Sequence, residues 1–148
     1  MRLIKQSGPH CLVTSAAMIL DTTPEQLHSE IGTTGEDIWW PPSHMRGIHI
    51  QEIQDCCLRR NRCLYPIEIN PLLAPDSTGL CEARECYPEK VRLPRLKTEL
   101  RFSRAILITD NHAVAWDGRQ VFDPKGFIKS FEDYQIHEAW VLAQVMML

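Results

Sequence analysis

The stretch HAVAWDGRQVFDP, residues 112–124, holds two short apolar segments separated by Asp117-Gly118. Asp-Gly between alternating apolar runs is a strong local signal for a β-hairpin. Glycine adopts the positive φ of a type I′ turn without steric cost, and aspartate tolerates it better than most residues. The stretch therefore predicts a two-residue turn at Asp117-Gly118 with a strand on either side.

The position of this turn decides which side chains face each other. Trp116 is expected to face Arg119, and His112 is expected to face Asp123. Directly opposed residues lie on one face of a hairpin, with Cβ atoms about 5 Å apart. A carboxylate beside an imidazole fixes its tautomer and favours the imidazolium. The alternative interpretation is a surface His–Asp pair with no role beyond the hairpin.

The other elements follow from apolar spacing and from capping residues. We expect helices over 11–20, 24–32 and 48–61, and strands over 63–69, 105–109 and 139–145. Residues 33–47 are expected to form a loop, and the proline-rich segment 70–95 an irregular insertion. Helices followed by antiparallel strands predict an α+β fold, and 148 residues predict a single domain over 1–148.

Composition excludes several classes of protein. The net charge is −3 and the basic residues are scattered, so no basic face predicts binding to nucleic acid. Nowhere does an apolar run approach the ~20 residues of a membrane helix, and the N-terminal segment has no small-residue cleavage site. We therefore expect a cytoplasmic protein without a membrane partner, whose six cysteines are reduced thiols.

Cys11 is the candidate nucleophile because it stands where the first helix begins, after Ser7-Gly8-Pro9. The partial positive charge and free N–H groups of a helix N-terminus stabilise a thiolate, which is the reactive form. Gln6 carries an amide that can donate to a developing oxyanion beside the Cys11 backbone N–H. The alternative is that Cys11 is a small core residue, as most free cysteines are.

The other cysteines are weaker candidates. Cys81 and Cys86 have a spacing at the edge of that found in zinc sites, but no second pair of metal ligands accompanies them. We therefore expect no metal and no other cofactor. Trp39, Trp40 and His44 in the 33–47 loop are candidates for substrate contact, with packing against the core or a partner as the alternative for the tryptophans.

Gln6, Cys11, His112 and Asp123, in this order along the chain, resemble the catalytic residues of the papain-like cysteine peptidases. Within that superfamily the chain is most similar to small bacteriocin-leader (double-glycine) peptidases and to short papain-fold proteins of bacteria and tailed phages. The resemblance covers about residues 6–20 and 105–124. It implies a papain-like fold, Cys11 as nucleophile, His112 as general base and acid, Asp123 as orienting residue and Gln6 as oxyanion donor.

Three functions are compatible with these residues. The first is a cysteine peptidase that cleaves peptide or isopeptide bonds of a protein or peptide substrate through an acyl-enzyme. The second is an acyltransferase or deamidase with the same triad, because the cleft rather than the triad selects the acceptor. The third is a non-catalytic papain-fold module that binds or inhibits a partner, in a host cytoplasm if a phage encodes it.

Overall fold

The computed structural model describes residues 1–36, 39–40, 45–69 and 89–146. Its helices are α1 (Cys11–Ile19), α2 (Pro24–Ile31), α3 (Ile50–Leu58) and α4 (Glu89–Glu99), followed by the short 3₁₀ segments η2 (Leu100–Phe102) and η3 (Phe131–Asp133). Its strands are β1 (Trp39–Trp40), β2 (Met45–Arg46), β3 (Arg62–Glu68), β4 (Ala105–Thr109), β5 (His112–Trp116), β6 (Val121–Asp123), β7 (Phe127–Lys129) and β8 (Glu138–Gln144).

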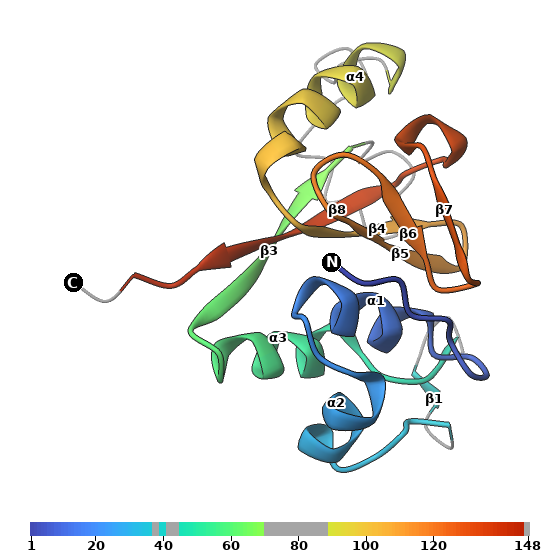
Figure 1. Cartoon of the computed structure of the whole chain (residues 1–148), viewed down its shortest axis with the longest axis vertical. Coiled ribbons are helices and arrows are strands. Elements are labelled where there is room, and N and C mark those ends of the chain that lie inside the picture. Colours follow the sequence, from blue (N-terminus) through green and yellow to red (C-terminus); the bar gives the residue numbers. More distant parts are fainter. Residues whose placement is uncertain (37–38, 41–44, 70–88, 147–148) are drawn as a thin grey trace.

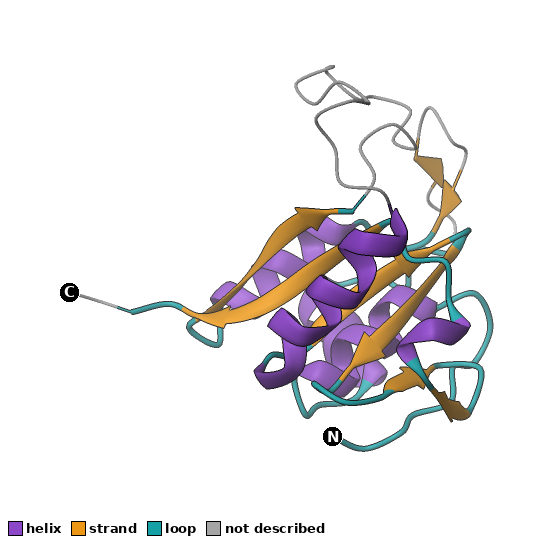
Figure 2. Ribbon diagram, turned by 90° about the horizontal axis from the view of Figure 1, so that it is seen from above, coloured by secondary structure: helices purple, strands orange, loops and turns teal. Residues whose placement is uncertain are grey.

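Strands β3 to β8 form one antiparallel sheet in the order β3-β8-β4-β5-β6-β7, and β1 pairs with β2 separately. The three N-terminal helices lie on one side of the sheet and α4 lies on the other (Figure 1). The view from above shows the sheet between these two helical layers (Figure 2). The predicted α+β class is thus confirmed.

Two groups of buried side chains hold these layers together. The first lies between α1–α3 and the sheet, where Ala16, Ala17 and Ile19 of α1 belong to one buried cluster with Ala113 and Ala115 of β5. The small alanines on both surfaces let the helix approach the strand closely. The second group lies on the other face of the sheet, and its largest fully buried side chain is that of Trp116.

Capping residues place the ends of α2 as the sequence predicted. The side chain of Thr23 accepts a hydrogen bond from the Gln26 N–H at 3.1 Å, and Pro24 occupies the first turn. Gly32 ends the helix with a φ of 91°, which glycine adopts without strain. The strand predicted over 105–109 is also confirmed, with the same bounds.

The predicted irregular insertion over 70–95 is wrong in its last part, because the chain is helical from Glu89 onward. Pro94 lies within α4, where proline normally disfavours a helix. Leu96 and Leu100 on the same stretch are 1% and 3% exposed, so burial of this apolar face outweighs the poor local propensity. The first part of the predicted insertion, 70–88, lies outside the described residues.

The predicted register of the hairpin is also wrong. Trp116 faces Val121 rather than Arg119, so the loop spans 117–120 instead of two residues. The Asp117 carboxylate accepts hydrogen bonds from the backbone N–H groups two and three residues later, at 2.8 and 2.7 Å. This local bonding competes with the two-residue turn and stabilises the longer loop.

Candidate active site

Cys11 is the first residue of α1, and the turn that precedes it uses the left-handed conformation of Gly8, whose φ is 71°. No side chain caps the first turn of this helix, and no acidic residue lies in it. The backbone N–H of Leu12 donates a hydrogen bond to the Cys11 sulfur. The positive end of the helix therefore acts directly on the thiol.

The N-terminal part of α1 is hydrogen-bonded to both backbone groups of Ala113 on β5. The Ala113 N–H donates to the Cys11 sulfur, and the Ala113 carbonyl accepts a hydrogen bond of 3.0 Å from the hydroxyl of Ser15. Cys11 and Ser15 are four residues apart, so they lie on the same face of the helix. The paired residues of β5 and β6 begin two positions further on, at Ala115. The helix thus occupies the bonding positions that a neighbouring strand would otherwise take.

His112 and Asp123 are in contact although the predicted register was wrong. The Nε2 atom of His112 lies 2.8 Å from Oδ1 of Asp123. The observed register, continued along the strands, sets Asp123 opposite Val114. A shift of two residues keeps every side chain on its original face, so the histidine and the aspartate become diagonal neighbours within reach of each other.

His112 is hydrogen-bonded to both Cys11 and Asp123. Because Nε2 is engaged by the carboxylate, Nδ1 is the ring nitrogen left for the sulfur. His112 is the first residue of β5, directly after the turn at Asp110-Asn111, where Asn111 has a φ of 52°. The start of α1, the start of β5 and the end of β6 thus bring together the three residues predicted from the sequence, which are Cys11, His112 and Asp123.

The charges of these three groups support one another. Burial by itself would raise the pKa of the Cys11 thiol, but hydrogen bonds from His112 and Ala113, and the imidazolium charge, lower that pKa overall. The hydrogen bond to Cys11 raises the pKa of His112 against the opposing effect of burial, and Asp123 raises it further. The arrangement therefore favours a thiolate beside an imidazolium.

Asp123 is almost completely buried, with 2% of its side chain exposed. Burial would raise the pKa of this carboxyl, but hydrogen bonds from the Tyr134 hydroxyl, the Lys125 N–H and His112 together lower it. The carboxylate thus stays ionised where it meets the imidazole. Tyr134, Ser15 and the Ala113 N–H were not predicted from the sequence, because no local pattern reports contacts made across the fold.

Gln6 lies beside the end of β6, the strand that carries Asp123. Its backbone N–H donates to the Pro124 carbonyl at 2.6 Å, and its side-chain amide donates to the Gly8 carbonyl at 2.7 Å. An amide nitrogen carries two hydrogens, so this bond leaves one for a further acceptor. The Gln6 amide is thus tied to the loop that leads into Cys11.

The loop predicted to contact substrate is described in part. Trp39 and Trp40 form β1, but their side chains, like the whole of His44, lie outside the described residues. The described start of this loop is anchored near the nucleophile, because Nε2 of His10 lies 2.9 Å from Oε1 of Glu36. His10, the neighbour of Cys11 in sequence, is therefore paired with this loop rather than with the thiol.

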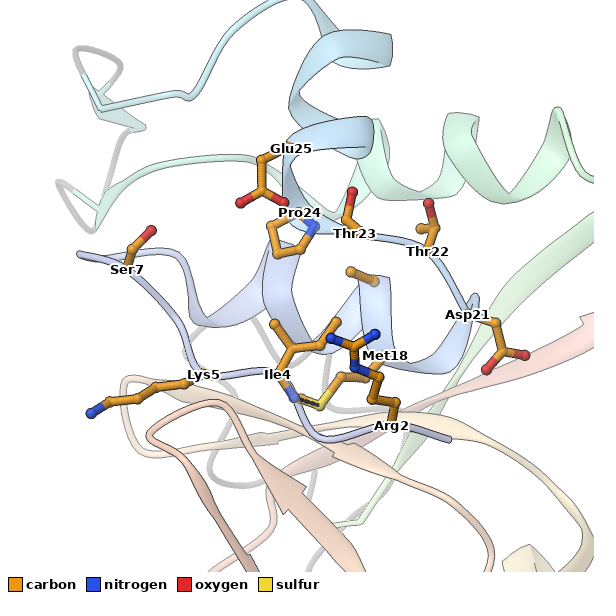
Figure 3. Close-up of a pocket in the computed structure, with 11 residues that line it drawn as sticks. Arg2, Ile4, Lys5, Ser7, Met18, Asp21, Thr22, Thr23, Pro24 and Glu25 are labelled. Carbon is orange, nitrogen blue, oxygen red and sulfur yellow. Dashed lines mark hydrogen bonds between the residues drawn. The ribbon is translucent and has the colours of Figure 1, made fainter.

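A pocket of about 480 Å³ lies between the N-terminal segment and the junction of α1 with α2 (Figure 3). Ile4 and Met18 meet at its base, where the Ile4 N–H donates to the Met18 sulfur at 3.3 Å. Cys11, His112 and Asp123 are not among its lining residues.

The described cysteines, Cys11, Cys56, Cys57 and Cys63, are free thiols. Burial raises the pKa of Cys56 and raises the pKa of Cys57 to about 12, in contrast to the lowered pKa of Cys11. Cys81 and Cys86, considered as zinc ligands, lie outside the described residues. Among the residues that the structure describes, no cluster of three or more metal-ligating side chains occurs.

Within the described ranges, every helix is too short or too polar to span a bilayer. Comparisons with protein-family models, curated proteins and solved structures found no match.

Proposed function

We propose that the protein is a papain-like cysteine peptidase that hydrolyses peptide or isopeptide bonds through an acyl-enzyme. The observation that carries the proposal is the chain of hydrogen bonds from the Cys11 sulfur to His112 and from His112 to the buried Asp123 at 2.8 Å. A helix start behind the sulfur and a carboxylate behind the imidazole are the two features that activate a cysteine nucleophile.

In the first half-reaction, the Cys11 thiolate attacks the carbonyl carbon and a carbon–sulfur bond forms. The negative oxygen of the tetrahedral intermediate accepts hydrogen bonds from the Cys11 backbone N–H and, in this proposal, from the Gln6 amide. His112 then gives its proton to the leaving amine as the carbon–nitrogen bond breaks. The result is a thioester on Cys11 and a neutral imidazole.

In the second half-reaction, His112 removes a proton from water, and the resulting hydroxide attacks the thioester. The carbon–sulfur bond breaks, a carboxylic acid leaves, and the thiolate–imidazolium pair is restored. Asp123 does not exchange a proton in either half. It keeps Nε2 protonated, so that the other ring nitrogen remains directed at the sulfur.

A papain-like fold is part of the same proposal. It is supported by the nucleophile at the start of a helix packed on the sheet, and by His112 and Asp123 on the adjacent strands β5 and β6.

The experiment is a cleavage profile on a peptide library prepared from a whole proteome. The wild type should create new peptide termini that Cys11→Ala does not, and each cleavage should add the mass of one water. Cys63→Ala is the matched control, because it removes a free, partly exposed thiol outside the site. Products that carry an amine adduct instead of water would replace hydrolysis by acyl transfer. Identical profiles for the wild type and Cys11→Ala would contradict the proposal and favour a binding module.

A further inference from the structure

The buried carboxylate of Asp123 has a donor on each oxygen. Oδ1 accepts from Nε2 of His112 at 2.8 Å and from the Lys125 N–H at 2.9 Å. Oδ2 accepts from the hydroxyl of Tyr134 at 2.6 Å. A buried charge is tolerated when its lone pairs are satisfied, and the bond to Tyr134 is the one made by a side chain outside the proposed triad.

Tyr134 reaches Asp123 from a separate part of the chain. It follows η3, whose Phe131 is 2% exposed and packs edge-on against Trp116, with ring centroids 5.3 Å apart. A capping box closes that turn, and the Tyr134 N–H donates to the Phe131 carbonyl at 3.3 Å. Trp116 lies on the same strand as His112, so one strand positions both partners of the carboxylate.

We propose that Tyr134 is a positioning residue of the site: its hydroxyl keeps Asp123 ionised and turned toward His112, so that the thiolate–imidazolium pair persists in mildly acidic solution. The inference rests on the proposed function in one respect, since it takes Cys11 and His112 as the reacting pair.

The electrostatic surroundings agree with this role. The titratable groups that act on this pair are His112 on β5, which acts on Asp123, and Asp133, which acts on Tyr134. Cys11 on α1 acts in turn on His112. Burial, then the bond to Asp123, raises the pKa of Tyr134, so the phenol stays a donor throughout the neutral and acidic range. Among the effects that lower the pKa of Asp123, the Tyr134 hydroxyl is the largest.

The test measures how fast iodoacetamide alkylates Cys11 between pH 4 and pH 9, with the modified residue identified by mass spectrometry. The rate falls on the acid side as the thiolate–imidazolium pair is lost. We expect Tyr134→Phe to move the midpoint of this acid limb upward by about one pH unit, a roughly tenfold loss of rate on the limb. Tyr65→Phe, which removes a half-exposed phenol on the edge strand β3, should leave the midpoint unchanged.

Two further variants separate positioning from simple loss of structure. In the Asp123→Asn background, Tyr134→Phe should shift the midpoint little, because no carboxylate remains to be kept ionised. In a Tyr65→Phe, Tyr87→Phe background, 3-fluorotyrosine is incorporated at Tyr134 alone. Its more acidic phenol is a stronger donor, so the midpoint should move to lower pH. This arm needs no loss of the hydroxyl and therefore decides the question even if Tyr134→Phe does not fold.

The outcomes distinguish this inference from the proposed function. A wild-type Cys11 without reactivity in acid would overturn both. A wild-type acid limb that stays in place, or moves to lower pH, in folded Tyr134→Phe would overturn the role of Tyr134 alone. The same conclusion follows if 3-fluorotyrosine leaves the midpoint where it is.

Discussion

Replacing Ser15 with alanine should weaken the attachment of α1 to β5. The Ser15 side chain is fully buried, and its hydroxyl donates to the Ala113 carbonyl at 3.0 Å. Removing the donor leaves a buried carbonyl without a partner, which costs about 1–3 kcal/mol. The urea slope of a small protein is typically about 1–3 kcal/mol per molar, so a loss near 2 kcal/mol lowers the unfolding midpoint by about 1 M.

The matched control is Thr14→Val, one residue earlier on the same helix. Thr14 is 1% exposed, and its hydroxyl has no hydrogen-bond partner, so an isosteric valine should be neutral or stabilising. Urea unfolding followed by circular dichroism compares the two variants with the wild type. If Ser15→Ala costs no more than Thr14→Val, the bond to Ala113 does not hold the helix to the strand.

Three other changes test separate parts of the account. Asp123→Asn removes the buried charge behind the imidazole, so Cys11 alkylation at pH 6 should slow about tenfold or more; an unchanged rate would remove Asp123 from the site. Gly118→Ala places a Cβ 2.6 Å from the Arg101 carbonyl oxygen, at a φ of 102°. It should lower the free energy of unfolding by well over the roughly 1 kcal/mol expected for Gly32→Ala, where nothing lies within 4 Å of the added Cβ. Equal urea midpoints for the two variants would contradict the close packing of the loop on Arg101. Gln6→Ala should lower turnover about 10²-fold without loss of stability, and unchanged turnover on a substrate from the cleavage profile would mean that another group binds the oxyanion.

The sequence predicted those parts of the fold that short-range chemistry determines. The ends of α2 are set by contacts within a few residues, made by Thr23, Pro24 and Gly32. The ends of β4 follow from its apolar run. The predicted two-residue turn was wrong because the Asp117 side chain accepts hydrogen bonds from the backbone and stabilises the longer loop 117–120. The helix α4 was not predicted because its stability comes from burial against the sheet, whereas Pro94 within it argues against a helix.

The candidate site shows the same division. Cys11, His112 and Asp123 were recognisable because a helix start and a strand pair position each of them locally, and an error of two residues in register preserved the face. Tyr134 approaches from a turn after β7, and nothing in its neighbouring residues points to Asp123. Such a partner becomes visible once the tertiary packing of Phe131 on Trp116 is known.

The most direct test of the central claim is the reactivity of Cys11 at pH 6. An ordinary thiol with a pKa near 8.5 is well under 1% thiolate at this pH. Because His112 and the first turn of α1 lower the pKa of Cys11, iodoacetamide should label Cys11 in preference to Cys56 and Cys57, whose pKa values burial raises. His112→Ala should abolish that preference. A Cys11 that reacts no faster than a thiol in the denatured chain would contradict the activated nucleophile.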